Sequence, residues 1–160
     1  MIVQEIPGQV FDYFASQKTV TLATASPHGD PHASTFMYAN EGPTLYFWAR
    51  PTSTTATHLR SNPRTSFAID EYVEDWNRAK GIQGTGNAEQ VSSGDEVAKV
   101  VGLFADKFPS PSSGASTTNI TFFKIIPSAL QFIDNSGVTS ISGDEFGMDF
   151  HRQDVLTGTD

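Results

Sequence analysis

A run of hydroxyl side chains beside an arginine is the part of this sequence best suited to ligand chemistry. It comprises Arg50, Thr52, Ser53, Thr54 and Thr55 and leads into an expected short helix over residues 54–61. The first backbone N–H groups of a helix have no partner within the helix, so a helix N-terminus surrounded by hydroxyls attracts anions. The alternative is that one hydroxyl caps the helix and the others are solvated. The stretch is therefore a candidate phosphate site, with a plain helix cap as the alternative.

Basic residues concentrate around the same stretch, although the whole chain carries a net charge of −8. That negative charge argues against nucleic acid or an anionic membrane as a partner. Residues 50–64 nevertheless contain no acid, and five of the ten Lys and Arg residues fall between positions 50 and 80: Arg50, Arg60, Arg64, Arg78 and Lys80. This local excess suits a small anion, and the alternative is a solvated basic edge.

The four histidines do not form a metal-binding pattern. His28 and His32 are four residues apart, but a turn with Gly and Pro separates them, so they do not share a helix face. His58 lies on the expected short helix and is the one imidazole near the candidate anion site. Its alternative is an ordinary surface or core histidine. We therefore predict no metal site.

Two tryptophans offer flat surfaces on which a planar ligand can stack. Trp48 lies within an apolar segment and is expected in the core. Trp76 lies in an acidic, aromatic connection over residues 71–78. It is the better candidate for contact with a ligand or at an interface.

The length and composition indicate one domain over residues 1–160, large enough to bury a core. The absence of cysteine excludes disulfides and thiolate metal sites and agrees with a reducing cytoplasm. No apolar run approaches the roughly 20 residues of a membrane span. We expect a soluble cytoplasmic protein.

Short β-rich segments separated by turn signals dominate the pattern. Strands are expected over residues 19–25, 32–39, 45–49, 65–70, 82–91, 120–126 and 129–133. Helices are expected over residues 3–16, inside an N-terminal segment 1–18, over 54–61, and from Ser92 or Ser93 to Phe108. Because helices are too few for alternating βαβ units, the pattern predicts a small antiparallel barrel with flanking helices.

Two further features concern the strand interiors and the tail. Gly81, Gly84 and Gly86 fall within one expected strand, which predicts a bulge or a close approach to the backbone. In the C-terminal tail, residues 137–160, three apolar side chains alternate as in a strand: Phe146, Met148 and Phe150. We expect this tail to fold over the body or over a second subunit.

Four segments together resemble the pyridoxamine 5′-phosphate oxidase-like, FMN-binding split-barrel family. They are VTLATASPHGDPHASTFMY, LYFWARPTSTTATHLRSNPRTSFAID, GIQGTGNAEQV and FFKIIPSALQFIDN. The most specific part is the strand, hydroxyl-rich turn and short helix ending in Leu59-x-x-Asn62-Pro63-Arg64. The resemblance implies a mainly β fold with flanking helices, a six-stranded antiparallel Greek-key split barrel. It also implies a homodimer that holds two flavins at the subunit interface.

Carried over by position, the resemblance puts the flavin phosphate near Arg50, Ser53, Thr54 and Thr55. The oxidases carry a cation at the position of Thr55, and two more at positions that match Ser34 and Ala39. One charge-assisted hydrogen bond contributes about 1.5–3 kcal/mol, so we expect FMN to bind less tightly here.

Arg50 and the helix N-terminus would offset part of the lost affinity for the flavin phosphate, with His58 or Arg60 as further contributors. The basic residues that hold the substrate phosphate in the oxidases have no match in the acidic tail. Pyridoxamine phosphate is therefore not the expected substrate.

Gln83 lies on the strand that faces the flavin ring in the family. The resemblance implies that its amide contacts the ring nitrogen N5 or the ring carbonyls; the alternative is an ordinary outward strand residue. We expect an FMN-dependent oxidoreductase acting on an unidentified small molecule. The alternatives are a deazaflavin in place of FMN, or a non-catalytic haem-binding, small-ligand-binding or sensor protein on the same fold.

Overall fold

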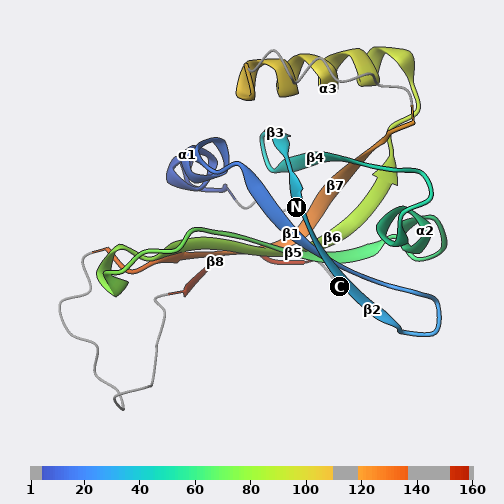
Figure 1. Cartoon of the computed structure of the whole chain (residues 1–160). Coiled ribbons are helices and arrows are strands. Elements are labelled where there is room, and N and C mark those ends of the chain that lie inside the picture. Colours follow the sequence, from blue (N-terminus) through green and yellow to red (C-terminus); the bar gives the residue numbers. More distant parts are fainter. Residues whose placement is uncertain (1–4, 110–118, 137–151, 159–160) are drawn as a thin grey trace.

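Eight strands form one antiparallel sheet that curls into a half-barrel in the computed structural model, which describes residues 5–109, 119–136 and 152–158 (Figure 1). The strands are β1 (Thr19–Ala25), β2 (Pro31–Met37), β3 (Ala39–Glu41), β4 (Thr44–Ala49), β5 (Arg64–Asp70), β6 (Lys80–Gln90), β7 (Thr121–Asp134) and β8 (Arg152–Leu156). Their spatial order is β2-β1-β5-β6-β7-β4-β3, and β8 pairs with β7. The expected mainly β split barrel is confirmed, with eight strands in place of six.

β7 is one continuous strand where two strands joined at Pro127 were expected. The ladder between β6 and β7 changes register between Thr85 and Gly86, and Gly86 pairs with Pro127. Because a bulge tolerates a proline that cannot donate to the ladder, the strand continues past it. The prediction that the glycines mark a bulge is confirmed at this position.

Two of these glycines also leave room for close neighbours. A Cβ atom at Gly86 would overlap the backbone carbonyl oxygen of Ile126, and one at Gly84 would overlap the Phe67 ring and the Leu130 side chain. Both neighbours of Gly84 belong to the barrel core. The side chains that approach the Gly84 backbone therefore lie inside the barrel.

Three α-helices and one 3₁₀ turn complete the described fold: α1 (Gly8–Ser16), α2 (Thr54–Ser61), α3 (Gly94–Lys107) and η1 (Trp76–Arg78). α1 begins at Gly8 and not at residue 3, because Pro7 is the N-cap residue and has an extended backbone. The bounds of α2 agree with the prediction. In α3, the Ser93 hydroxyl accepts from the Glu96 N–H at 3.1 Å, so Ser93 is the cap.

The core has two parts. The larger fills the barrel between the sheet and α1 and includes Phe14, Leu22 and Phe47. The smaller lies between α3 and the sheet and consists of four buried residues: Tyr46, Val91, Val100 and Phe122. Trp48 is 37% exposed, so its expected place in the core is wrong. It lies on the same face of β4 as Tyr46, but only Tyr46 belongs to the cluster beneath α3.

The outer face of the sheet is the surface that matters for ligand binding. Buried and exposed residues alternate along β1 and β5, as expected for strands with one face on the core. The outward positions carry small or polar side chains: Thr21, Ala23, Ser66, Ala68, Gln83 and Thr85. The described helices lie over the other face or at the end of the sheet (Figure 1).

The C-terminal segment adds a strand that the sequence did not predict. β8 pairs with the second half of β7, and Val155 is 2% exposed within the core. The expected strand around Phe146, Met148 and Phe150 lies outside the described residues. Within the described part of the chain, no helix has the length and apolar character needed to cross a membrane.

Candidate functional site

A concave trough runs along the outer face of β5 and β6. Its central cavity, of about 610 Å³, has a floor formed by β1, β5, β6 and β7 and a wall formed by the C-terminal segment. The side chains of the floor and wall are small or polar for the most part: Thr21, Ala23, Ser66, Ala68, Gln83, Thr85, Ala129, Gln131, Asp154 and Thr157. Among the described residues that line this central cavity, none is Lys or Arg.

Two further cavities extend the trough to both ends of the strands. One, of about 380 Å³, shares Ala68 and Gln83 with the central cavity and reaches Tyr72 and Trp76. The other, of about 620 Å³, shares Ser66 and other floor residues with the central cavity and reaches Arg64. We use the word trough for these three adjoining cavities.

Gln83 lies where two of the cavities join. Its neighbours Ile82 and Gly84 are buried, so strand alternation turns Gln83 outward, where it is exposed. Across the sheet it pairs with Ala68 of β5 and Gln131 of β7. Its amide therefore lies on the outer face of the sheet, between the strands that form the floor of the trough.

Trp76 lies at one end of the same trough, so the structure brings it together with Gln83. It is 45% exposed, and its backbone carbonyl accepts from the Asn135 amide Nδ2 at 3.1 Å. The position of Trp76 is thus fixed by a hydrogen bond to the residue that follows β7. It can offer a ring surface to a ligand only at that end of the trough.

The turn before α2 behaves first of all as a helix cap. The Ser53 hydroxyl accepts from the Ala56 N–H at 3.2 Å, and the Ser53 N–H donates to the Arg50 carbonyl oxygen at 3.0 Å. Thr55 is 2% exposed, whereas Arg50 and Thr54 are exposed. Ser53 therefore serves as the cap, and the exposed groups of the turn are the ones open to a ligand.

Arg60 returns from the last turn of α2 to this stretch. Its Nη1 donates to the Pro51 carbonyl oxygen at 2.6 Å, which holds a guanidinium beside Arg50 and the helix N-terminus. At the positions that match the other oxidase cations, Ser34 is half-buried and Ala39 is buried. The positive charge near the turn therefore comes from Arg50 and Arg60, and not from the positions that carry cations in the oxidases.

His58 points away from this turn. Its Nδ1 lies 3.0 Å from Thr24 Oγ1 in a hydrogen bond, and its ring is edge-on to the His32 ring at 6.0 Å between centroids. Thr24 lines the cavity that reaches Arg64. His58 is therefore associated with β1 and β2 rather than with the hydroxyl-rich turn.

The residues predicted from the sequence thus occupy two places. Gln83 and Trp76 line the trough, whereas Arg50, Ser53, Thr54 and Thr55 line none of its three cavities. β5 begins directly after α2 and Pro63, so Arg64 is the residue that connects the two places along the chain.

Several trough residues escaped sequence reasoning. Gln131 Nε2 donates to Asp154 Oδ1 at 3.0 Å, and this bond ties the C-terminal segment to the floor. Ser66 and Thr85 also face the trough. In the sequence, strand alternation places Ser66 and Thr85 at outward positions of β5 and β6, among other small residues. This alternation predicts that they face away from the core, but it does not predict a cavity.

The groups with the most strongly shifted pKa values lie elsewhere. Burial raises the pKa of Tyr13 and of Tyr38, and burial together with the charge of Lys18 lowers the pKa of Lys107 to about 8. None of the three lines the trough. Among the described residues, no cluster of three or more His, Cys, Asp or Glu could hold a metal ion. The trough can therefore bind a ligand through its concave shape, its hydrogen-bonding side chains and the ring of Trp76.

Comparison with known proteins gives one family match. The family model described as pyridoxamine 5′-phosphate oxidase matches residues 6–134. No curated protein matches the chain significantly.

Solved structures with the same fold are numerous. The conserved hypothetical protein Rv2991 from Mycobacterium tuberculosis is 21% identical, with a TM-score of 0.74 over 89% of this chain and 99% of that chain. The haem storage protein HutZ from Vibrio cholerae is 18% identical, with a TM-score of 0.67 over 79% and 93%. A haem-binding protein from Mycobacterium smegmatis is 22% identical, with a TM-score of 0.68 over 85% of this chain and 57% of that chain. At these identities the neighbours establish a shared fold.

Proposed function

The chain belongs to the pyridoxamine 5′-phosphate oxidase family, and from this premise we propose that it binds FMN and acts as an FMN-dependent oxidoreductase. The substrate would be a small molecule other than pyridoxamine phosphate. The observation that carries the proposal is the exposed Gln83 amide, which lines two adjoining cavities of the trough.

The trough fits the ring of a flavin. Small side chains such as Ala23, Ser66 and Ala68 leave a shallow floor on which a planar ring system can lie flat. Gln83 supplies both a donor and an acceptor for the polar edge of the ring. Trp76 supplies a flat surface at one end. When bound, FMN would carry the electron transfer, and the chain's residues would hold, orient and shield the ring.

The turn before α2 fits a phosphate through mainly neutral donors. With the Ala56 N–H occupied by Ser53, the N–H groups of Thr54 and Thr55 are the first donors of the helix left for an anion. Arg50 and Arg60 supply the positive charge nearby. We expect weaker binding of FMN than in the oxidases, because three cations of the oxidase pattern are absent.

A homodimer with flavin at the subunit interface is part of the same proposal. The support in this chain is that no described helix lies over the outer face of the sheet, because the family's implied flavin sites lie between subunits.

The experiment is an absorbance spectrum of the purified protein, followed by titration with FMN, riboflavin and a deazaflavin at micromolar concentration. We expect flavin absorbance or quenching of FMN fluorescence, with riboflavin bound more weakly because it lacks the phosphate. A preference for the deazaflavin would change the cofactor and leave the ring site in place. Absence of colour together with absence of quenching would refute flavin binding.

Haem binding without catalysis is the second candidate. Two structural neighbours are described as a haem storage protein and a haem-binding protein, and His58 and His32 place two imidazoles side by side at the α2 end of the sheet. Haem titration separates the candidates: a Soret band that His58→Ala removes would favour a haem carrier. A second variant, His151→Ala, tests the histidine outside the described residues.

A further inference from the structure

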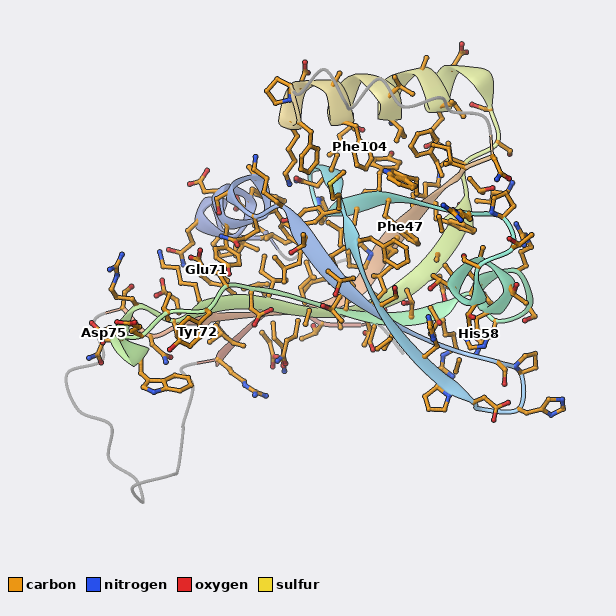
Figure 2. All side chains as sticks on the ribbon, viewed as in Figure 1. Phe47, His58, Glu71, Tyr72, Asp75 and Phe104 are labelled. Atoms are coloured by element: carbon orange, nitrogen blue, oxygen red, sulfur yellow. The ribbon has the colours of Figure 1, made fainter. Side chains whose placement is uncertain are left out.

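The cavity of about 620 Å³ at the α2 end of the trough is lined by one cation and no acid among the described residues. That cation is Arg64. The central cavity instead contains Asp154, and the cavity at the other end contains two acids and two cations: Asp70, Glu71, Lys80 and Arg152. Figure 2 shows the acids Glu71 and Asp75 at one end of the sheet and His58 of α2 at the other. An anionic group of a ligand therefore meets an unopposed positive charge at the α2 end of the trough.

The backbone of Arg64 is anchored, whereas its side chain is exposed. The Arg64 N–H donates to Asn62 Oδ1 at 3.3 Å, and Asn62 Nδ2 donates to the Ala25 carbonyl oxygen of β1 at 3.3 Å. The Ala88 N–H donates to the Pro63 carbonyl oxygen at 2.8 Å. In the described part of the chain, Arg64 takes part in none of the ion pairs. Its guanidinium therefore extends from a fixed backbone and is open to a ligand.

Neutral hydrogen-bonding groups lie beside this guanidinium. Asn87 of β6 is directly opposite Arg64, and Thr85 is directly opposite Ser66. All four residues are exposed and line the same cavity. The side chains of Asn87, Thr85 and Ser66 form no hydrogen bond to another described residue. One amide and two hydroxyls can therefore bind a ligand together with the guanidinium.

The bulge in β7 shapes the floor of this cavity. Thr85 pairs with Ala129 and Gly86 pairs with Pro127, so Ser128 is the extra residue without a partner in the ladder. Consecutive residues of a regular strand face opposite sides, yet Ser128 and Ala129 both line the trough. Bulges re-aim side chains in this way beside binding sites. The bulge therefore supplies two small side chains to the floor at the point where the α2-end cavity joins the central one.

A carboxylate matches this set of groups. A guanidinium can bind both oxygens of a carboxylate through two parallel hydrogen bonds, and one positive charge balances one negative charge. The neutral donors can satisfy the remaining lone pairs of the two oxygens. A phosphate group would bring a charge of about −2, and the described lining of the cavity has no second cation. The α2 end of the trough therefore favours a carboxylate over a phosphate.

We propose that the small molecule on which the protein acts carries a carboxylate, which Arg64 binds at the α2 end of the trough. The rest of the molecule lies toward the central cavity, because the two cavities share three small floor residues: Ala23, Ser66 and Thr85. This arrangement places the molecule beside the proposed flavin ring. The inference rests on the proposed function in that this carboxylate compound would be the substrate.

Benzoate and benzamide are suitable probes, because they have nearly the same shape and differ in charge. Each is titrated at low salt into the purified protein without flavin, and the dissociation constants come from the shifts of the backbone amide signals in NMR spectra. We expect benzoate to bind about fivefold to tenfold more tightly than benzamide, since a hydrogen bond between charged groups is stronger than a neutral one. The preference should shrink at about 1 M salt, because salt screens exposed charges.

Two variants test the role of the guanidinium. Arg64→Gln should remove the preference for benzoate, because glutamine keeps a hydrogen-bonding group and loses the charge. Arg78→Gln is the matched control, since it removes the same charge from an exposed arginine that lines none of the three cavities. It should keep the preference. Asn87→Asp leaves Arg64 in place but puts a carboxylate opposite it, and should weaken benzoate binding about tenfold. Thermal unfolding checks that each variant remains folded.

Equal affinities of the wild type for benzoate and benzamide, or a preference that survives in Arg64→Gln, would overturn the inference. The flavin itself is the other source of an anionic group. If Arg64→Gln weakened the binding of FMN but not that of riboflavin, the cavity would hold the flavin phosphate and the substrate assignment would be wrong.

The flavin titration of the wild type is scored separately. Flavin binding without a preference for benzoate refutes the carboxylate site and keeps the proposed function. A preference for benzoate that depends on Arg64, in a protein that binds no flavin, refutes the proposed function and keeps the carboxylate site.

Discussion

The Lys107 Nζ lies 3.7 Å from the centre of the Tyr38 ring and donates to the Phe14 carbonyl oxygen at 3.3 Å. The Tyr38 hydroxyl donates to the same oxygen at 2.6 Å, and Lys18 Nζ donates to the Lys107 carbonyl oxygen at 3.3 Å. Phe14 belongs to α1 and Lys107 ends α3. The C-terminus of α3 is therefore held against the barrel by a half-buried ammonium group.

This contact predicts a pH dependence of stability. Burial, and secondarily the charge of Lys18, lowers the pKa of Lys107 from 10.5 to about 8. Between these values the unfolded chain binds more protons than the folded one, so the free energy of unfolding rises with pH from about 8 to about 10.5. We expect a gain of about 1 kcal/mol, reduced from the full conversion because the group is half-exposed and screened by solvent.

The measurement is urea unfolding at a series of pH values. Lys107→Met should abolish the rise, whereas Lys80→Met, at an exposed position on β6, should keep it. Above about pH 10.5 the free energy of unfolding falls again, because burial raises the pKa of Tyr38 and the tyrosine ionises first in the unfolded chain. Equal slopes for the wild type and Lys107→Met would contradict the prediction.

The bulge between β6 and β7 predicts an unequal sensitivity of the glycines. Gly86→Ala should lower the free energy of unfolding by about 2–4 kcal/mol, because the new Cβ would overlap the Ile126 carbonyl oxygen, a backbone atom. Gly84→Ala meets side chains that can shift and should cost about 1–3 kcal/mol. Gly102→Ala is the control: a Cβ there meets nothing within 4 Å, and helix propensity predicts a gain of about 0.5–1 kcal/mol. A neutral Gly86→Ala would refute the close approach.

The proposed phosphate site predicts a loss that depends on the phosphate. Arg50→Ala with Thr54→Ala should weaken FMN binding about tenfold, since a charged donor and one exposed hydroxyl disappear. Binding of riboflavin should not change, and the dimer should remain intact. Thr57→Ala, on an exposed face of the same helix, is the matched control. Unchanged FMN affinity would place the phosphate elsewhere.

The proposed ring site predicts the complementary behaviour. Gln83→Ala should weaken FMN and riboflavin to the same extent, by about threefold to tenfold for one lost neutral hydrogen bond. Stability should change by less than about 0.5 kcal/mol, because an exposed strand residue contributes little to the core. Gln90→Ala, also exposed and at the far end of β6, should affect neither. If Gln83→Ala weakened the binding of FMN but not that of riboflavin, Gln83 would not contact the flavin ring.

The sequence predicted the elements that local chemistry determines. α2 was predicted at its observed bounds because Ser53 can cap it and Pro63 forces the chain out of the helix. β1 was predicted at its observed bounds because its β-rich segment ends at a turn built on Pro and Gly. Trp48 was misplaced because burial depends on which element packs on each face of β4. The break expected at Pro127 failed for a similar reason, since the bulge opposite it belongs to a different strand.

The candidate site was predictable in its parts and not in their arrangement. Arg50 and Ser53 indicated a candidate anion site through their position before a helix, and Gln83 was predicted from the family resemblance. The trough itself arises from strands far apart in the sequence, β1, β5, β6 and β7. No local pattern could indicate that Gln131 ties Asp154 to its floor, or that Arg60 returns to Pro51.

The position of β7 in the chain has a consequence for how the protein is made. This strand pairs with β6 along one edge and with β4 and β8 along the other, yet it is not complete until residue 134. While the ribosome is still adding the preceding residues, β4 and β6 have edges with no partner, and such edges attract other chains. Pairing across such long sequence separations is slow. Closure of the sheet must therefore wait until β7 has been translated, and nascent chains stalled before β7 are the form most prone to aggregate.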